Sequence, residues 1–129
     1  MHRLFALATL AALSTPAAAD WERMGGIENV FSAYADPDTL RREGSSATMR
    51  GLYDFDHPDQ TVDGQTHYST VVLREYDCSQ ARVRLLSFTD YSGRMGAGRA
   101  IATGENTRRW EAIVAGAVDE AFWRYACGI

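Results

Sequence analysis

Hydrophobic and polar residues alternate along much of the chain with a period of two, the pattern that predicts β-strands. The longest alternating run spans residues 82–91, and a second run of the same character, residues 69–78, lies directly before it. Only the short link Ser79-Gln80-Ala81 separates the two, and so few residues can join only antiparallel neighbours. We therefore predict a central β-hairpin.

Charged side chains near the link predict the register of this hairpin. We expect Asp77 to face Arg82 and Glu75 to face Arg84, because opposite charges across an antiparallel pair attract. Alternation then groups the remaining residues of that face as Leu73, Val71, Leu86 and Phe88. The other face carries Cys78, Tyr76, Arg74, Val72, Val83 and Leu85. It is the more apolar face at the turn end, so we expect it to point into the core.

Shorter runs flank the hairpin. Strands are predicted at residues 21–24, closed by Gly25-Gly26, and at residues 30–35, ended by Asp36-Pro37-Asp38 because proline cannot donate to a strand ladder. Residues 39–42 are predicted to form a turn or a single helical turn. Further strands are predicted at residues 47–55 and 99–103, with a polar loop at 56–64 and an apolar run at 110–114. Because no helix separates the early strands, the sheet should be antiparallel.

One helix is predicted, over residues 117–126. Acids in its first turn and Arg124 in its last suit the helix dipole, and Gly128 can end it. Its apolar stripe consists of Val118, Ala121, Phe122 and Tyr125. Cys127 lies about opposite that stripe, so we expect the helix to unwind by Ala126. The predicted fold is α+β, an antiparallel sheet of about six strands with a C-terminal helix packed on one face.

The N-terminal segment changes the domain picture. Residues 1–19 have a basic start, an apolar run and the small-residue pattern Ala17-Ala18-Ala19, all typical of a secretory signal peptide. Cleavage after Ala19 leaves one domain, residues 20–129, with no integral membrane segment expected. No cysteine follows the cleavage site, which disfavours a lipid anchor. We expect an exported protein that is periplasmic, associated with the cell surface, or secreted.

Charge and cysteine content narrow the function. The 17 acids outnumber the 13 basic residues, all of them arginines, so nucleic-acid binding is disfavoured. Only two cysteines, Cys78 and Cys127, are present, and in an exported chain they most simply form one disulfide. That bond would tie the helix to the turn of the hairpin. The sequence leaves a homodimer open.

Several motifs contain residue types that can bind metals or phosphate or catalyse reactions, and none predicts an enzyme. Acids gather around residues 54–63, but Pro58 and Gln65 stand where a calcium loop needs ligands. His57 and His67 supply only two ligands, whereas a zinc site needs three or four. The glycines at residues 93–98 lack a following helix to cradle phosphate, and the pattern around a catalytic serine is absent. We therefore expect no metal, no cofactor and no catalytic residue.

A binding patch is the remaining candidate site. Alternation places Arg82 and Arg84 on one strand face, with Tyr91 and Met95 further along. Pairing of the arginines with Asp77 and Glu75 is the structural alternative. We nominate Arg82, Arg84, Tyr91 and Met95 as the residues that contact a ligand.

Ordered motifs along the chain resemble the surface-adhesin protein E family. They are Trp21, Tyr34-x-Asp36-Pro37, Leu40-Arg41-Arg42-x-Gly44, Glu75-x-Asp77-Cys78, Arg82-x-Arg84, Tyr91, Met95-Gly96-x-Gly98, Trp110 and Cys127. The resemblance implies a sheet of about six antiparallel strands with a C-terminal helix disulfide-bonded to its concave side. It also implies contact with host matrix and serum proteins.

Two function classes follow. The first is a noncatalytic, adhesin-like binding domain that recognises a protein partner. The alternative is a periplasmic inhibitor of a secreted or cell-wall-acting enzyme, because a small disulfide-tied scaffold is preorganised for binding.

Overall fold

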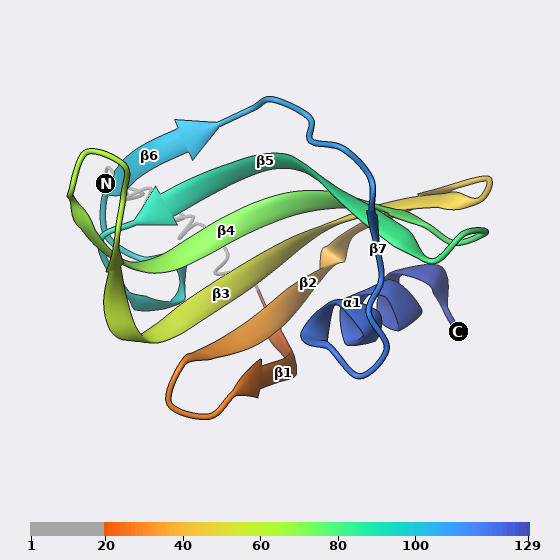
Figure 1. The fold of residues 1–129 in the computed structure, drawn as a ribbon, viewed down its shortest axis with the longest axis horizontal. Helices are drawn as coiled ribbons and strands as arrows, with labels where there is room; N and C mark the ends of the chain where they lie inside the picture. Colours follow the sequence, from red (N-terminus) through yellow and green to blue (C-terminus); the bar gives the residue numbers. More distant parts are fainter. Residues whose placement is uncertain (1–19) are drawn as a thin grey trace, which may run out of the picture.

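Six antiparallel strands follow one another across a single sheet in their sequence order. The computed structural model describes residues 20–129, so the predicted signal peptide lies outside the described residues. The strands are β1 (Glu22–Ile27), β2 (Phe31–Glu43), β3 (Ser46–Gln60), β4 (Thr66–Asp77), β5 (Arg82–Tyr91) and β6 (Ala100–Gly104). Figure 1 shows this meander, with the helix α1 (Val118–Cys127) against one side of it. The predicted α+β fold is confirmed.

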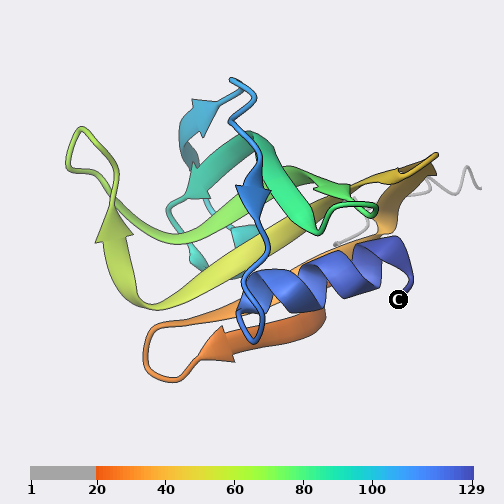
Figure 2. The ribbon, with the colours of Figure 1, turned by 45° about the vertical axis from the view of Figure 1, so that its right-hand side comes forward.

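Two short elements complete the chain. The 3-10 turn η1 (Arg94–Gly96) connects β5 to β6, and the two-residue strand β7 (Glu111–Ala112) pairs with the first residues of β5. Strand β5 therefore has β6 beside its C-terminal half and β7 beside its N-terminal end. Figure 2 shows β7 descending past the sheet toward α1, which crosses the sheet face.

The break predicted at Asp36-Pro37-Asp38 is wrong, because β2 continues through Pro37 to Glu43. Pairing with β3 is interrupted between Asp36 and Arg41, so the proline occupies a stretch that needs no ladder donor. The Thr39 hydroxyl fills the gap, accepting a hydrogen bond from the Arg50 amide at 2.9 Å and donating to the Asp36 carbonyl oxygen at 2.7 Å. The turn or helical turn predicted at residues 39–42 is part of this strand instead.

Two other predicted boundaries also fall inside strands. Strand β1 runs through Gly25 and Gly26. Its pairing with β2 shifts between Arg23 and Gly25. A Cβ atom at Gly26 would lie 2.4 Å from the Phe31 carbonyl oxygen. Strand β3 extends to Gln60 and pairs there with β4, so the predicted polar loop shrinks to residues 61–65. In both places glycine or acidic residues suggested a turn, and pairing with a neighbouring strand overrides that local preference.

The core lies between the sheet and α1. Its buried residues are Ala33, Ala35, Ala47, Met49, Tyr76, Val83, Phe122 and Ala126. Small side chains on β2 and β3 leave room for the helix, and a Cβ atom at Gly51 would lie 3.2 Å from the Phe122 ring. Tyr76 and Val83 confirm that the predicted face of the hairpin points inward. The predicted helix stripe is partly right. Phe122 is buried as expected, but the other buried residue of the helix, Ala126, lies outside the predicted stripe.

Cys78 and Cys127 form the predicted disulfide, with their Cα atoms 5.5 Å apart. The expected unwinding of the helix is wrong, because α1 remains helical through Cys127. Trp123 and Cys127 share one flank of the helix at a spacing of four residues, and that flank meets the β4–β5 turn. Gly128, at φ 68°, then ends the helix in the left-handed conformation.

Candidate functional site

The two arginines nominated on β5 are paired as their register predicted. Arg82 lies opposite Asp77, with its Nε 2.8 Å from the Asp77 Oδ2, and Arg84 lies opposite Glu75, with its Nε 2.6 Å from the Glu75 Oε1. The Ser46 hydroxyl donates to the other oxygen of Glu75 at 2.8 Å. These pairs are partly exposed, so they add modestly to stability.

A bulge changes the face assignment further along the hairpin. The pairing of β4 with β5 shifts between Leu73 and Arg74, and Leu86 is the residue left without a partner. Phe88 therefore lies opposite Val72 and on its face, whereas the unbroken register had placed it with Val71. The extra residue reverses the alternation beyond it.

Trp110 is part of this cluster, although no pattern in the sequence connects it with the two arginines. Its ring lies under both guanidinium groups, 4.6 Å from that of Arg82 and 4.3 Å from that of Arg84. The pairing of Arg82 with Ala112 and of Val83 with Glu111 in β7 brings Trp110 to this position. Cation–π contacts of this kind hold the ring in place.

Asp77 is the most strongly held acid of the cluster. Its Oδ1 accepts hydrogen bonds from the Ser79 amide and the Ser79 hydroxyl, at 2.9 and 2.7 Å, and Arg82 contacts its other oxygen. These contacts, first that of the Ser79 hydroxyl and then that of Arg82, lower the pKa of Asp77 to about 2. The carboxylate therefore stays charged through the neutral and mildly acidic range.

Tyr91 and Met95 lie far from the two arginines. Seven residues of extended strand separate Arg84 from Tyr91, which corresponds to roughly 23 Å. Met95 lies in η1 with a left-handed φ of 55° and is 38% exposed. Its amide donates a hydrogen bond to the Asp54 Oδ1 at 2.8 Å. The structure thus divides the four nominated residues between the two ends of β5.

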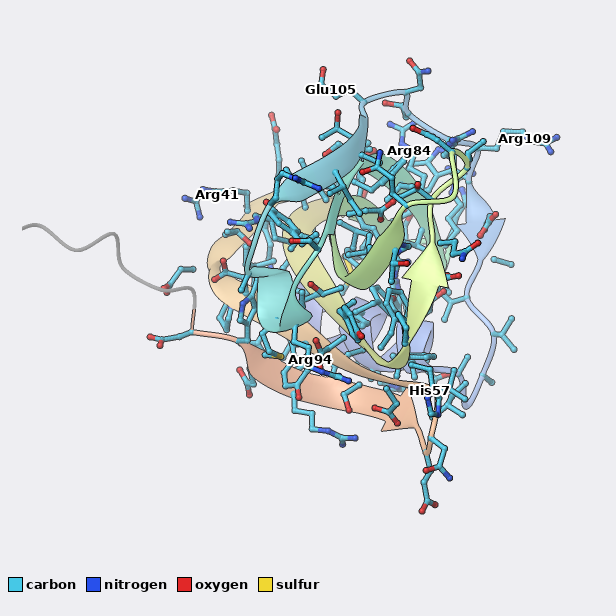
Figure 3. The ribbon with its side chains drawn as sticks, turned by 90° about the vertical axis from the view of Figure 1, so that its left-hand side faces the viewer. Arg41, His57, Arg84, Arg94, Glu105 and Arg109 are labelled. Carbon is cyan, nitrogen blue, oxygen red and sulfur yellow. A yellow bond between two sulfur atoms is a disulfide. The ribbon has the colours of Figure 1, made fainter. Side chains whose placement is uncertain are left out.

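A groove of about 560 Å³ opens on the helix face of the sheet, beside the Arg84 end of β5. Its lining residues are Arg74, Val83, Arg84, Leu85, Thr107, Arg108, Arg109, Glu111 and Asp119. They come from β4, β5, the segment of residues 107–111 and the first turn of α1. Figure 3 shows Arg84 and Arg109 at the same end of the molecule, with Arg109 projecting outward, and Arg94 well away from them.

Arg74 closes the inner end of the groove. Its Nη1 lies 3.1 Å from the Asp119 Oδ1, donates to the Tyr53 hydroxyl, and its guanidinium lies 5.0 Å from the centre of the Tyr53 ring. Burial raises the pKa of Tyr53, and that of Tyr76 on the same face, so both hydroxyls remain protonated. A charged residue on the inward face of β4 is therefore accommodated by partners from β3 and α1.

Tyr91 lines a second, smaller hollow of about 300 Å³, together with Arg50, Leu73 and Thr89.

The two histidines that bracket the shortened loop differ in exposure. His67 is buried with its ring at right angles to that of Phe55, and His57 is exposed (Figure 3). Among residues 20–129, no three His, Cys, Asp or Glu side chains are grouped as metal ligands.

The fold and the groove define a class of small domain in which an antiparallel meander carries a disulfide-tethered C-terminal helix on one face. The chain belongs to the surface-adhesin protein E family, whose model matches residues 21–128. As a member of this family it is an exported, adhesin-like protein. Within the described part of the chain, no helix is long and apolar enough to cross a membrane.

Solved structures similar to the chain are those of protein E from Haemophilus influenzae. The selenomethionine form is 12% identical, with a TM-score of 0.66 over 88% of this chain and 90% of that one. Protein E from a non-typeable strain is also 12% identical, with a TM-score of 0.64 over 92% and 82% of the two chains. At this identity the likeness establishes a shared fold. A search of curated proteins gave no significant match.

Proposed function

We propose that this protein is a noncatalytic binding protein that recognises a protein partner outside the cytoplasm. The observation that carries the proposal is its membership in a surface-adhesin family, which covers residues 21–128. The architecture supports it, since the disulfide and the helix make one face of the sheet rigid before any partner arrives. Binding by a preorganised surface loses little conformational entropy.

Cleavage after Ala19 is the first part of this proposal. The mature protein begins at Asp20, after removal of the signal peptide at residues 1–19. The intact mass of the protein recovered from outside the cytoplasm should match that of residues 20–129, less two hydrogen atoms because the two cysteines form one disulfide. A mature N-terminus more than a few residues from Asp20 would contradict the proposed cleavage.

The identity of the partner class is tested by affinity capture. Biotinylated residues 20–129 are presented separately to solubilised extracellular-matrix proteins and to a periplasmic extract, with the reduced and alkylated protein as control. Retention of matrix proteins by the oxidised bait alone supports adhesion. Exclusive capture of a periplasmic or secreted hydrolase, with loss of its activity, would replace adhesion by the alternative function, enzyme inhibition.

Location separates the same two functions. Brief protease treatment of intact cells should cleave an adhesin at the cell surface and leave a periplasmic marker enzyme intact. Protection of this protein until the outer envelope is opened would count against adhesion.

A further inference from the structure

We propose that the groove between β5 and residues 107–111 binds an acidic peptide segment of the partner, with Arg108 and Arg109 contacting its carboxylates. An aliphatic side chain of the same segment would rest on Val83 and Leu85. This inference deepens the proposed function and rests on it. It assigns the ligand chemistry to residues outside the four that the sequence had nominated.

The groove is basic, although the protein as a whole is acidic. The chain as a whole carries a net charge of −4, yet the groove is lined by four arginines and two acids. Arg74 is paired with Asp119, and Arg84 is paired with Glu75. Arg108 and Arg109 have no ion-pair or side-chain hydrogen-bond partner among residues 20–129, and Glu111 is the acid left beside them. Two guanidinium groups thus remain available in an otherwise acidic protein.

The backbone that carries these arginines is held in place. The Arg108 amide donates to the Leu85 carbonyl oxygen at 2.8 Å, and the Ile113 amide donates to the Ala81 carbonyl oxygen at 2.9 Å. Between these two hydrogen bonds, Trp110 stacks against Arg82 and Arg84. The paired arginines of the hairpin therefore position the segment that presents the unpaired ones, which reduces the entropy lost on binding.

The shape and lining of the groove favour a peptide over other anions. A guanidinium group binds a carboxylate through two parallel hydrogen bonds, so two unpaired arginines lining one groove suit two acidic side chains. Val83 and Leu85 add an apolar floor, which the repeating sulfates and hydroxyls of an anionic polysaccharide would not use. A volume of about 560 Å³ is within the range of sites that hold a few side chains.

The test uses a display library of random heptapeptides panned on immobilised residues 20–129. Enriched peptides should combine Asp or Glu with Leu, Ile or Val, and a synthetic copy of one of them is titrated against variants. The double variant Arg108→Ala and Arg109→Ala should bind it at least roughly tenfold more weakly, because two charge-assisted contacts are lost. The matched control, Arg23→Ala with Arg99→Ala, removes two exposed arginines elsewhere and should bind within about twofold of the wild type.

Two further measurements sharpen the result. Glu111→Gln removes the remaining acid at the groove and should strengthen binding, and raising the salt concentration from 50 to 500 mM should weaken it. Enrichment of peptides without acids, or equal binding by the two double variants, would overturn the inference. Binding of heparin that competes with the peptide and is lost in the Arg108 and Arg109 double variant would overturn the assignment to a peptide.

Capture of matrix proteins distinguishes failure of the groove assignment from failure of the proposed function. If the Arg108 and Arg109 double variant captures the same matrix proteins as the wild type, the groove is not the contact surface, while the protein remains an adhesin. If the wild type captures no protein but binds the acidic peptides, the peptide chemistry stands and the proposed adhesion fails.

Discussion

The indole Nε1 of Trp123 donates a hydrogen bond to the main-chain oxygen of Asp77 at 2.8 Å. Asp77 is the residue before Cys78, and Trp123 lies one helical turn before Cys127. The helix is therefore joined to the β4–β5 turn twice, once through the disulfide and once through this hydrogen bond. The two links reinforce one another because both are made by the same flank of α1.

We expect Trp123→Phe to lower the free energy of unfolding by about 1–2 kcal/mol, because the buried Asp77 carbonyl loses its side-chain donor while most of the ring packing is kept. Urea denaturation of the oxidised protein measures the change. The control, Trp21→Phe, alters a ring that makes a cation–π contact with Arg50, whose guanidinium lies 5.6 Å from the ring centre, and should cost less than about 1 kcal/mol. Equal losses in the two variants would contradict the role given to the Trp123 hydrogen bond.

Removal of the disulfide should cost more. Closing a loop whose ends are 49 residues apart stabilises by about 4 kcal/mol in the chain-entropy model, an upper-end figure. Reduction should thus lower the melting temperature clearly, and thiol titration of the unfolded, unreduced protein should find no free cysteine. The Trp123 hydrogen bond should keep part of α1 docked after reduction, visible as retained helical circular dichroism below the new melting temperature.

The carboxyl of Asp77 predicts an acid-sensitive component of stability. Its pKa in the folded protein is about 2, below the value near 4 of an unfolded chain. Its contribution is therefore fully present above about pH 5 and is lost as the pH falls from 4 toward 2. Denaturant melts at several pH values should show a smaller loss over this interval in Asp77→Asn than in the wild type. Parallel curves would contradict the assignment.

Arg74 should be the most important arginine of the core face. Arg74→Ala removes the contacts to Tyr53 and Asp119 and the packing of a mostly buried side chain, so we expect a loss of about 2–4 kcal/mol. The control, Arg124→Ala, breaks an exposed pair with Glu120 and should cost less than about 0.5 kcal/mol. Similar melting temperatures for the two variants would show that the Arg74 network is not a stabilising one.

Arg82 and Arg84, which lie over the Trp110 ring, should affect local order more than global stability. Replacing Arg82 and Arg84 by alanine removes two partly exposed ion pairs and two cation–π contacts, so the unfolding free energy should fall by only about 1–3 kcal/mol. The amides of Arg108 and Ile113 should exchange hydrogen faster, since the ring between them is released. Unchanged exchange at both amides would mean that the stacking does not order residues 107–111.

Local patterns predicted the hairpin register because charge pairing and alternation agree over its first residues. They failed where a long-range partner decides the outcome. Pro37 lies within a strand because the hydroxyl of Thr39 substitutes for the missing ladder contacts, and Leu86 forms a bulge that alternation alone cannot reveal. Trp110 reaches the arginines only through β7, a strand of two residues with no periodicity of its own.

The disulfide also decides how the protein would carry a mechanical load. Tension applied at Cys127 passes through the sulfur atoms into Cys78, directly after the last residue of β4. Strands β5 and β6 and the helix lie inside the covalent loop and are shielded from extension. A pull between Asp20 and Cys127 could lengthen only the strands before Cys78, which shortens the maximum extension between these two points by roughly 170 Å for the 49 residues bridged by the bond.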